Sequence, residues 1–278
     1  MLGLGIAGAV ADTQEAGARL AGSSFSNQYS VDFDGVNDTV TLPNTTFWQG
    51  LLGSFDWSIS YWCKYPTAFN PSVTAANNGL NNFAGVNSSF QVETVIFGTL
   101  HGPNFGTASL RNRMTFQALL QGTDVVFSTN TVDLSSIISD DTWFHVVFAT
   151  EKTNGTRSSK IYINGVDRTD TDTSATFRFG NISATGGLIG AQDFIGSISN
   201  FTEMNIDECS VYSEALTSSK VTAIYNGGVP LDESSRTGLI GYWRFGDGDN
   251  LSGTTVLDQS SNSNNFTLSG ATFLKDAP

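Results

Sequence analysis

The most constraining feature of this sequence is the alternation of apolar and polar residues over short segments that end in turn-forming residues. Tyr29–Phe33 alternates in this way, and Asp34-Gly35 follows it. A period of two is the pattern of a half-buried β-strand, and Asp-Gly is a turn signal. Asn164-Gly165, between two further segments, predicts a two-residue hairpin. The pattern therefore predicts an all-β protein.

The remaining strands are expected along the whole chain after residue 29. They are predicted at 39–42, 58–64, 91–97, 113–120, 124–128, 143–150, 160–163, 177–179, 187–190, 195–202, 204–212, 238–245, 255–257 and 266–268. One helix is predicted over Thr217–Tyr225, because Thr217 can cap its start and Gly227-Gly228 can end it. Residues 66–90 carry no periodicity and predict a long surface loop. Many short strands with one short helix predict two antiparallel sheets packed face to face.

Four segments together resemble the laminin-G-like, concanavalin A-like family. They are Val31–Asp38 (F-D-G-x-D-D in the family), Phe55–Trp62 (F-T-I-S-A-W), Trp143–Val147 with Lys160–Gly165 (W-x-H-V … Y-x-N-G) and Ile206–Leu216 (I-D-E-V-R-I-Y-N-R-A-L). The likeness covers residues 29–228 and keeps the family's order and spacing. It implies a jelly-roll sandwich, and by itself it suggests a glycan-binding module with calcium bound at one rim.

The C-terminal segment departs from the family's order. Gly241–Gly248, Asp258–Asn262 and Phe266–Ala271 look like the strands that usually precede the opening segment. About 40 residues are too few to bury a core of their own, so a truncated second repeat is one interpretation. Exchange with a neighbouring subunit is another. We favour a circular permutation, with one sandwich over 29–278 that residues 238–278 complete.

Residues 1–28 are predicted to form an N-terminal docking arm. The apolar run at the start has no Lys or Arg before it, which argues against a cleaved signal peptide. A Gly- and Ala-rich arm loses much entropy when it becomes ordered and buries little area alone. We therefore expect it to contact another subunit, in a homo-oligomer or larger assembly, through five apolar residues: Met1, Leu2, Leu4, Ile6 and Val10.

The side chains expected between the two sheets are Phe33, Trp62, Trp143 and Ile163, because each lies on the apolar side of an alternating strand. The two cysteines, Cys63 and Cys209, match no metal motif. We expect them to be reduced thiols in the core, and a single disulfide between them is the alternative.

The charge balance excludes several partners. The chain has 26 acidic against 13 basic side chains, a formal net charge of -13. Such a chain repels nucleic-acid phosphates and anionic membranes, and no stretch is apolar enough to span a bilayer. Surplus carboxylates suit calcium, and the candidate ligands are Asp34, Asp38, Asp207, Asp247, Asp249 and Asp258. The alternative is that these residues only form turns.

Catalytic motifs are weak. His145 lies between large apolar residues and is expected to be structural, and His101 is expected in a loop. Glu203 and Glu208 imitate the E-x-D-x-x-E strand of related glucanases, but Asn205 replaces the central Asp. Their spacing predicts opposite faces of a strand unless a bulge intervenes. Retaining hydrolysis needs two carboxyl groups about 5 Å apart, so we expect no enzyme.

The composition favours a binding or structural role. Only 14% of residues are charged, and the polar surface is mainly Ser, Thr, Asn and Gly. With the N-terminal arm, this predicts a phage or viral virion component that decorates a capsid or belongs to a fibre or tail. The alternative is a secreted or cell-surface carbohydrate-binding module, and a glycoside hydrolase comes third. The fold does not decide among these functions.

Overall fold

The computed structural model describes residues 25–41, 56–69, 79–81, 84–85, 95–120, 124–153, 156–173, 187–194 and 197–278. The five arm residues predicted to contact another subunit, Met1, Leu2, Leu4, Ile6 and Val10, lie outside these ranges. Most of the loop predicted at 66–90 lies outside them as well.

The largest sheet has eight antiparallel strands. Seven follow the order β11-β10-β9-β3-β16-β1-β20, and β17 also pairs with β16. Their bounds are β1 Ser30–Asp34, β3 Trp57–Lys64, β9 Phe144–Thr153, β10 Thr156–Ile163, β11 Val166–Asp167, β16 Glu203–Tyr212, β17 Leu239–Trp243 and β20 Thr272–Leu274. The turn between β10 and β11 is the hairpin predicted at Asn164-Gly165, and both residues have a positive φ there, 52° and 77°.

Two smaller sheets of five strands each lie opposite the eight-stranded sheet. One has the order β12-β8-β7-β6-β4 and the other β18-β19-β2-β13-β5, and β14 pairs with β15 separately. Their bounds are β2 Thr39–Thr41, β4 Gly79–Asn81, β5 Ala84–Gly85, β6 Val95–His101, β7 Met114–Leu120, β8 Asp124–Thr131, β12 Thr169–Thr173, β13 Gly187–Ile189, β14 Gln192–Phe194, β15 Ser197–Ser199, β18 Thr255–Val256 and β19 Phe266–Ser269. A short 3-10 helix, η1, spans Ala108–Leu110.

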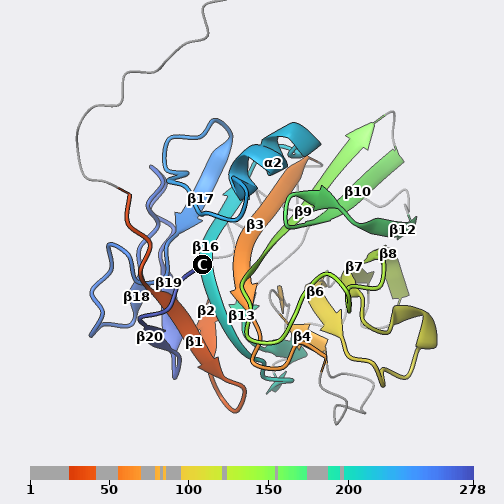
Figure 1. Ribbon diagram of the computed structural model, residues 1–278, viewed down its shortest axis with the longest axis horizontal. Helices are drawn as coiled ribbons and strands as arrows, with labels where there is room; N and C mark the ends of the chain where they lie inside the picture. The colour runs from red at the N-terminus through yellow and green to blue at the C-terminus, as the bar shows by residue number, and fades with distance from the viewer. Residues whose placement is uncertain are drawn as a thin grey trace, which may run out of the picture.

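The core lies between the eight-stranded sheet and the two smaller ones (Figure 1). Phe148 of β9 stacks on Phe116 of β7, with ring centroids 4.5 Å apart. Trp243 of β17 stacks on Phe266 of β19 at 3.8 Å. Each ring pair joins the large sheet to one of the smaller sheets, so the predicted all-β antiparallel sandwich is confirmed.

The helix predicted over Thr217–Tyr225 is confirmed as α2, which spans Ser218–Tyr225. The Thr217 side chain accepts a hydrogen bond from the backbone N–H of Lys220, and Asn226 ends the helix with a φ of 48°. Val221 and Ile224 pack against the face of the large sheet that points away from the smaller sheets, here called the outer face. Among the residues that the structure describes, no helix is long and apolar enough to cross a membrane.

The predicted core is partly confirmed. Phe33 and Ile163 are fully buried between the sheets. Trp62 is buried, but on the outer face, where it stacks on Tyr225 of α2 with centroids 5.8 Å apart. Because α2 covers this part of the sheet, β3 carries large aromatic side chains on both faces. Trp143 precedes β9 and is only half-buried, so its predicted burial was wrong.

The C-terminal strands add to the same sheets as the N-terminal ones. The strand predicted at 238–245 is β17, which pairs with residues 209–212 of β16, while β1 pairs with residues 203–206 along the same edge. In addition, β19 pairs with β2 and β20 pairs with β1. Figure 1 shows the blue C-terminal strands beside the red β1 strand. Segments far apart in the sequence therefore share one sandwich.

Gly241 of β17 should tolerate no side chain. A Cβ atom at this position would lie 2.2 Å from the Trp243 ring, which is itself fully buried. Because the ring has to move, we expect Gly241→Ala to lower the free energy of unfolding by about 1–3 kcal/mol. Urea denaturation measures this loss. Gly106→Ala is the control, since a Cβ there meets nothing within 4 Å, and equal stability of the two variants would contradict the prediction.

Candidate functional site

Two of the predicted calcium ligands, Asp34 and Asp38, lie in one turn after β1. Asp34 Oδ1 accepts hydrogen bonds from the backbone N–H groups of Val36 and Asn37, at 2.7 and 3.2 Å. Asp38 Oδ2 accepts from the Asp34 N–H at 2.9 Å. Burial raises the pKa of Asp38. These carboxylates bind backbone groups, as turn-forming aspartates do.

Two further predicted ligands, Asp249 and Asp258, hold the C-terminal segment together. Asp258 accepts backbone hydrogen bonds from Tyr242 at 3.0 Å and Asn264 at 2.8 Å. Asp249 accepts one from Leu257 at 2.7 Å. Within the described ranges, no group of three or more His, Cys, Asp or Glu side chains is arranged to hold a metal ion. Calcium binding stays a prediction.

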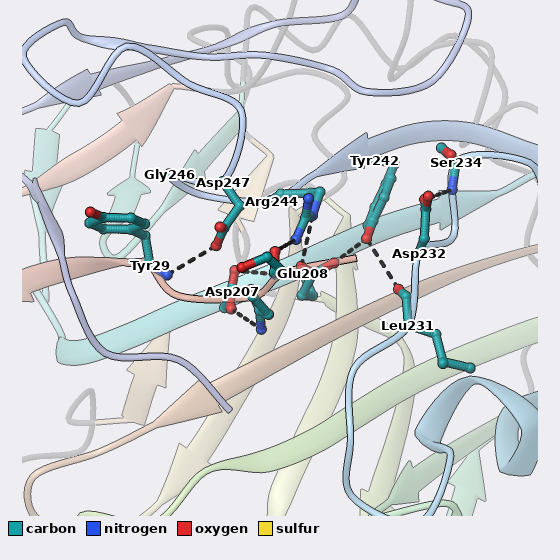
Figure 2. A network of polar contacts seen from close by, with 12 residues as sticks. Tyr29, Asp207, Glu208, Leu231, Asp232, Ser234, Tyr242, Arg244, Gly246 and Asp247 are labelled. Atoms are coloured by element: carbon teal, nitrogen blue, oxygen red, sulfur yellow. Dashed lines mark hydrogen bonds and ion pairs between the residues drawn. The ribbon is translucent and has the colours of Figure 1, made fainter. Parts of the chain in front are cut away.

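The last two predicted ligands, Asp207 and Asp247, belong to a buried polar network (Figure 2). Its centre is a bulge in β16 at Glu208, which has a φ of 46°. The pairing of β16 with β3 shifts register between Asp207 and Ser210. A bulge adds one residue to a strand, and here it turns the side chains of two successive acids to the outer face. The bulge lies where the neighbour of β16 changes from β1 to β17.

The two buried acids have strongly perturbed protonation. Glu208 accepts hydrogen bonds from Arg244 Nε at 3.0 Å and from the Tyr242 hydroxyl. Burial raises the pKa of Glu208 to about 7, although the Arg244 charge opposes the shift. Burial, and then the neighbouring Glu208 charge, raises the pKa of Asp207 well above its ordinary value. At neutral pH the pair therefore retains protons that exposed carboxyls would lose.

This network holds the residues that precede β1. Asn27 Nδ2 donates to Asp207 at 2.9 Å, and Asp247 accepts from the backbone N–H groups of Gln28 and Tyr29 at 2.8 and 3.0 Å. Arg244 also donates to the carbonyl of Ser26. Figure 2 shows Tyr29 facing Asp247 beside the ion pair. The carboxylates and the Arg244 guanidinium of the network bind one another or the residues before β1, and among the described residues only the buried Asn27 Oδ1 of this group has no hydrogen-bond partner, so we assign the network a structural role.

The prediction that Glu203 and Glu208 point to opposite faces was wrong. The bulge restores Glu208 to the outer face, which Glu203 also occupies, because Met204 and Ile206 between them point into the core. Five residues still separate the two Cα atoms by about 15 Å. Glu203 is exposed, and Glu208 is bound to Arg244. The two carboxyls are therefore far from the roughly 5 Å separation of a retaining pair.

The histidines are buried. Ser60 Oγ lies 2.8 Å from His145 Nε2, but His145 Nδ1 has no hydrogen-bond partner, so the carboxylate of a nucleophilic triad is missing. His101, predicted in a loop, is instead the buried last residue of β6. Burial lowers the pKa of His145 to about 3 and that of His101 to about 4.

Both cysteines are buried and free, as predicted. Burial raises the pKa of Cys63 and of Cys209 above the ordinary thiol value. Neither thiol is available as a thiolate nucleophile at neutral pH.

An open pocket lies on the outer face, between β9, β10 and the start of α2. Its volume is about 220 Å³, and it is lined by Ala149, Glu151, Ser158, Lys160, Tyr162, Ala215, Leu216, Thr217 and Ser218. The floor is formed by the buried side chains of Ala149, Tyr162 and Leu216. The Tyr162 hydroxyl lies 3.3 Å from Ser218 Oγ, which ties the start of the helix to the sheet.

The rim of the pocket carries opposite charges. Glu151 pairs with Ser158 in the β9–β10 register, and Lys160 pairs with Ala149 two positions along. Residues two apart share a face, so both charged side chains rise from the same surface. Lys160 Nζ lies 3.1 Å from Asp167 Oδ2, and this hydrogen bond raises the pKa of Lys160. An ammonium group has three donors, so one contact leaves donors for a ligand.

Sequence reasoning missed this pocket. Its residues come from two strands, a loop and the first residue of α2, and on the strands they follow an ordinary alternating pattern that carries no motif. A possible signal was the polar outer face of β10, where Ser158, Lys160 and Tyr162 follow one another at every second position.

No protein-family model and no curated protein sequence matches the chain. A solved structure of a candidate carbohydrate-binding protein from Bacteroides ovatus has the same fold, with a TM-score of 0.62 and 16% identity. The match covers 91% of this chain and 62% of the Bacteroides ovatus chain. This chain therefore spans less than two thirds of the length of that protein. At this identity the likeness establishes the fold alone.

Two weaker likenesses are to binding domains. The carbohydrate-binding module CBM40 of the Ruminococcus gnavus IT-sialidase, bound to α2,3-sialyllactose, matches with a TM-score of 0.46 and 12% identity, over 72% of this chain and 94% of that one. The binding domain of botulinum neurotoxin serotype C1 matches with a TM-score of 0.46 and 15% identity, over 74% and 47%. Both are too distant to bear on function.

Proposed function

We propose that this protein is a non-catalytic carbohydrate-binding module of a secreted or surface-exposed protein, and that the pocket between β9, β10 and α2 is its glycan site. The observation that carries the proposal is the composition of this pocket. A buried apolar floor is ringed by a carboxylate, an ammonium group and three hydroxyls, on Glu151, Lys160, Ser158, Thr217 and Ser218.

This composition suits a sugar. A pyranose has an apolar C–H face and a rim of hydroxyls that both donate and accept hydrogen bonds. Ala149 and Leu216 offer apolar surface for the face, while Glu151 can accept from two hydroxyls and Lys160 can donate to others. Drug-sized ligands occupy pockets of about 300–1,000 Å³. The smaller volume here suits one sugar residue at the end of a chain.

The virion interpretation gains no support from the Bacteroides ovatus structure, which is described as a candidate carbohydrate-binding protein. The apolar arm on which it depends lies outside the described residues. We therefore adopt the carbohydrate-binding interpretation, which was the alternative to the virion component in the analysis of the sequence. The absence of a close carboxyl pair at Glu203 and Glu208 favours binding without hydrolysis.

Filling the pocket should abolish glycan binding. Ser158 is exposed on the pocket wall, so a tryptophan there occupies the space without entering the core. We expect Ser158→Trp to weaken binding to any glycan retained on an array by at least about tenfold, since the ligand loses its site. Isothermal titration calorimetry measures the change.

The matched control is Ser269→Trp, an exposed strand position on β19 outside the pocket. It should bind as the unmodified protein does. Equal affinity of Ser158→Trp and Ser269→Trp for the same glycan would place the site elsewhere. Failure of the unmodified protein to bind any member of a broad neutral and acidic array would reject the function itself.

A further inference from the structure

The charges around the pocket decide what kind of sugar it accepts. Glu151 and Lys160 contribute one negative and one positive charge from diagonal positions on β9 and β10. Asp167, which binds Lys160 at 3.1 Å, contributes a second negative charge just outside the lining. The Asp167 carboxylate therefore already balances the charge of the Lys160 ammonium group, and the Glu151 carboxylate is left without a balancing positive charge. These three side chains together leave the pocket with a net negative charge.

The start of α2 is the opposing influence, because a helix N-terminus carries about half a positive charge and attracts anions. Its effect here is reduced in two ways. The Thr217 hydroxyl already accepts from the Lys220 N–H. The Lys220 ammonium group, which would add to the positive potential, is bound by both oxygens of Glu214 at 2.7 and 2.6 Å. The helix therefore offsets the negative charge only in part.

The charge of the whole chain acts in the same direction as the pocket. With a formal net charge of -13, the protein repels anions as they approach, and more strongly at low ionic strength. The charge of the pocket and the charge of the whole chain are therefore both negative, and both disfavour an anionic ligand.

On this basis, and resting on the proposed glycan site, we infer that the pocket selects an uncharged sugar residue over an acidic one. A neutral residue can place two hydroxyls on the Glu151 carboxylate while Lys160 donates to a third oxygen. A uronic or sialic acid residue brings a carboxylate close to Glu151, and Lys160 has its charge shared with Asp167. Acidic glycans, such as the sialyllactose bound by CBM40, are therefore expected to be poor ligands here.

The test compares each neutral sugar with an acidic counterpart. Glucose and glucuronic acid, galactose and galacturonic acid, and lactose and 3′-sialyllactose are titrated into the full chain at low ionic strength, followed by NMR or calorimetry. One like-charge contact at about 4 Å in water costs about fivefold in affinity. We expect each acid to bind about fivefold more weakly than its neutral partner.

The Glu151→Gln variant separates charge from shape, because it keeps the size of the side chain and removes its charge. Glu151 is exposed, so the fold should be unaffected. The variant should bring the acidic sugars to within about twofold of the neutral ones. The Lys160→Gln variant should instead weaken the binding of neutral and acidic sugars by similar factors.

Each outcome distinguishes the two proposals. Binding of the acids as tight as that of the neutral sugars, or tighter, would overturn the selectivity and leave the glycan site in place. Selective loss of acid binding in Lys160→Gln would also overturn it, because Lys160 would then be an anion anchor. If no sugar binds and the array is empty, the proposed function fails and the selectivity fails with it.

Discussion

A chain that ends at Gly228 will not melt cooperatively, because its C-terminal strands are integral to three different pairings. Without them, β16 loses β17, β2 loses β19 and β1 loses β20. The core also loses buried C-terminal side chains, among them Trp243, Phe245, Val256, Phe266 and Leu268. Each such side chain contributes about 1.5–3 kcal/mol by burial, and a domain is stable by only about 5–15 kcal/mol.

Circular dichroism in the near and far ultraviolet measures this outcome during heating. A chain that ends at Leu274 is the control, since it keeps all strands and loses only the last residues after β20. It should melt cooperatively and within a few degrees of the full chain. A Gly228-terminated protein with a sharp transition and native near-ultraviolet bands would show that the C-terminal segment is an appendage.

Replacing Arg244 by methionine should destabilise the protein by about 3–5 kcal/mol, because removing one partner of a buried ion pair leaves the other charge uncompensated. The partner here is Glu208, whose side chain is 2% exposed. The same change removes the bond to the Ser26 carbonyl and the contact with the Phe25 ring, 4.4 Å away. Urea denaturation at pH 8 measures the loss, and Lys220→Met is an exposed control.

The loss should grow with pH. The pKa of Glu208 is about 7 in the folded protein and 4.5 when unperturbed, so the folded state holds a proton that the unfolded chain releases. Stability therefore falls as pH rises between those values. Without Arg244 the pKa of Glu208 rises further, and the decline extends above pH 7. The lowered pKa values of His101 and His145 make stability rise with pH, but only below about pH 6.5, the pKa of an exposed histidine. Measurements of stability between pH 6.5 and 8.5 therefore report the buried acids without this opposing effect.

The double variant Arg244→Met, Glu208→Gln tests the cause. Glutamine cannot ionise, so the double variant should regain most of the stability and lose most of the extra slope with pH. If the double variant is as unstable at pH 8 as Arg244→Met alone, the loss arises from the packing of the Arg244 stem and from its bond to Ser26.

The sequence predicts local features of this fold well. The hairpin at Asn164-Gly165 and the capped helix after Thr217 are recognisable because each depends on a few adjacent residues whose backbone preferences agree. The burial of Phe33 and Ile163 follows from strand alternation alone. In these places local chemistry and the global fold favour the same structure.

What the sequence could not predict depends on partners far along the chain. The bulge at Glu208 has no local turn signal, and its acids are balanced by Arg244, which is 36 residues away. Trp62 was expected between the sheets, but it lies under α2, whose position on the outer face is a tertiary property. The pocket is missed for the same reason, since Glu151 and Leu216 meet only after folding.

The position of β1 and β20 at one side of the eight-stranded sheet has a consequence for how the protein can be displayed. The pocket lies toward the opposite side, on β9 and β10. Four strand spacings of about 4.8 Å place β10 about 19 Å from β1. Immobilising the protein through a tag that follows β20 at the C-terminal end should therefore leave the pocket turned toward solution, so that many copies on one bead or sensor surface can engage a branched glycan at once.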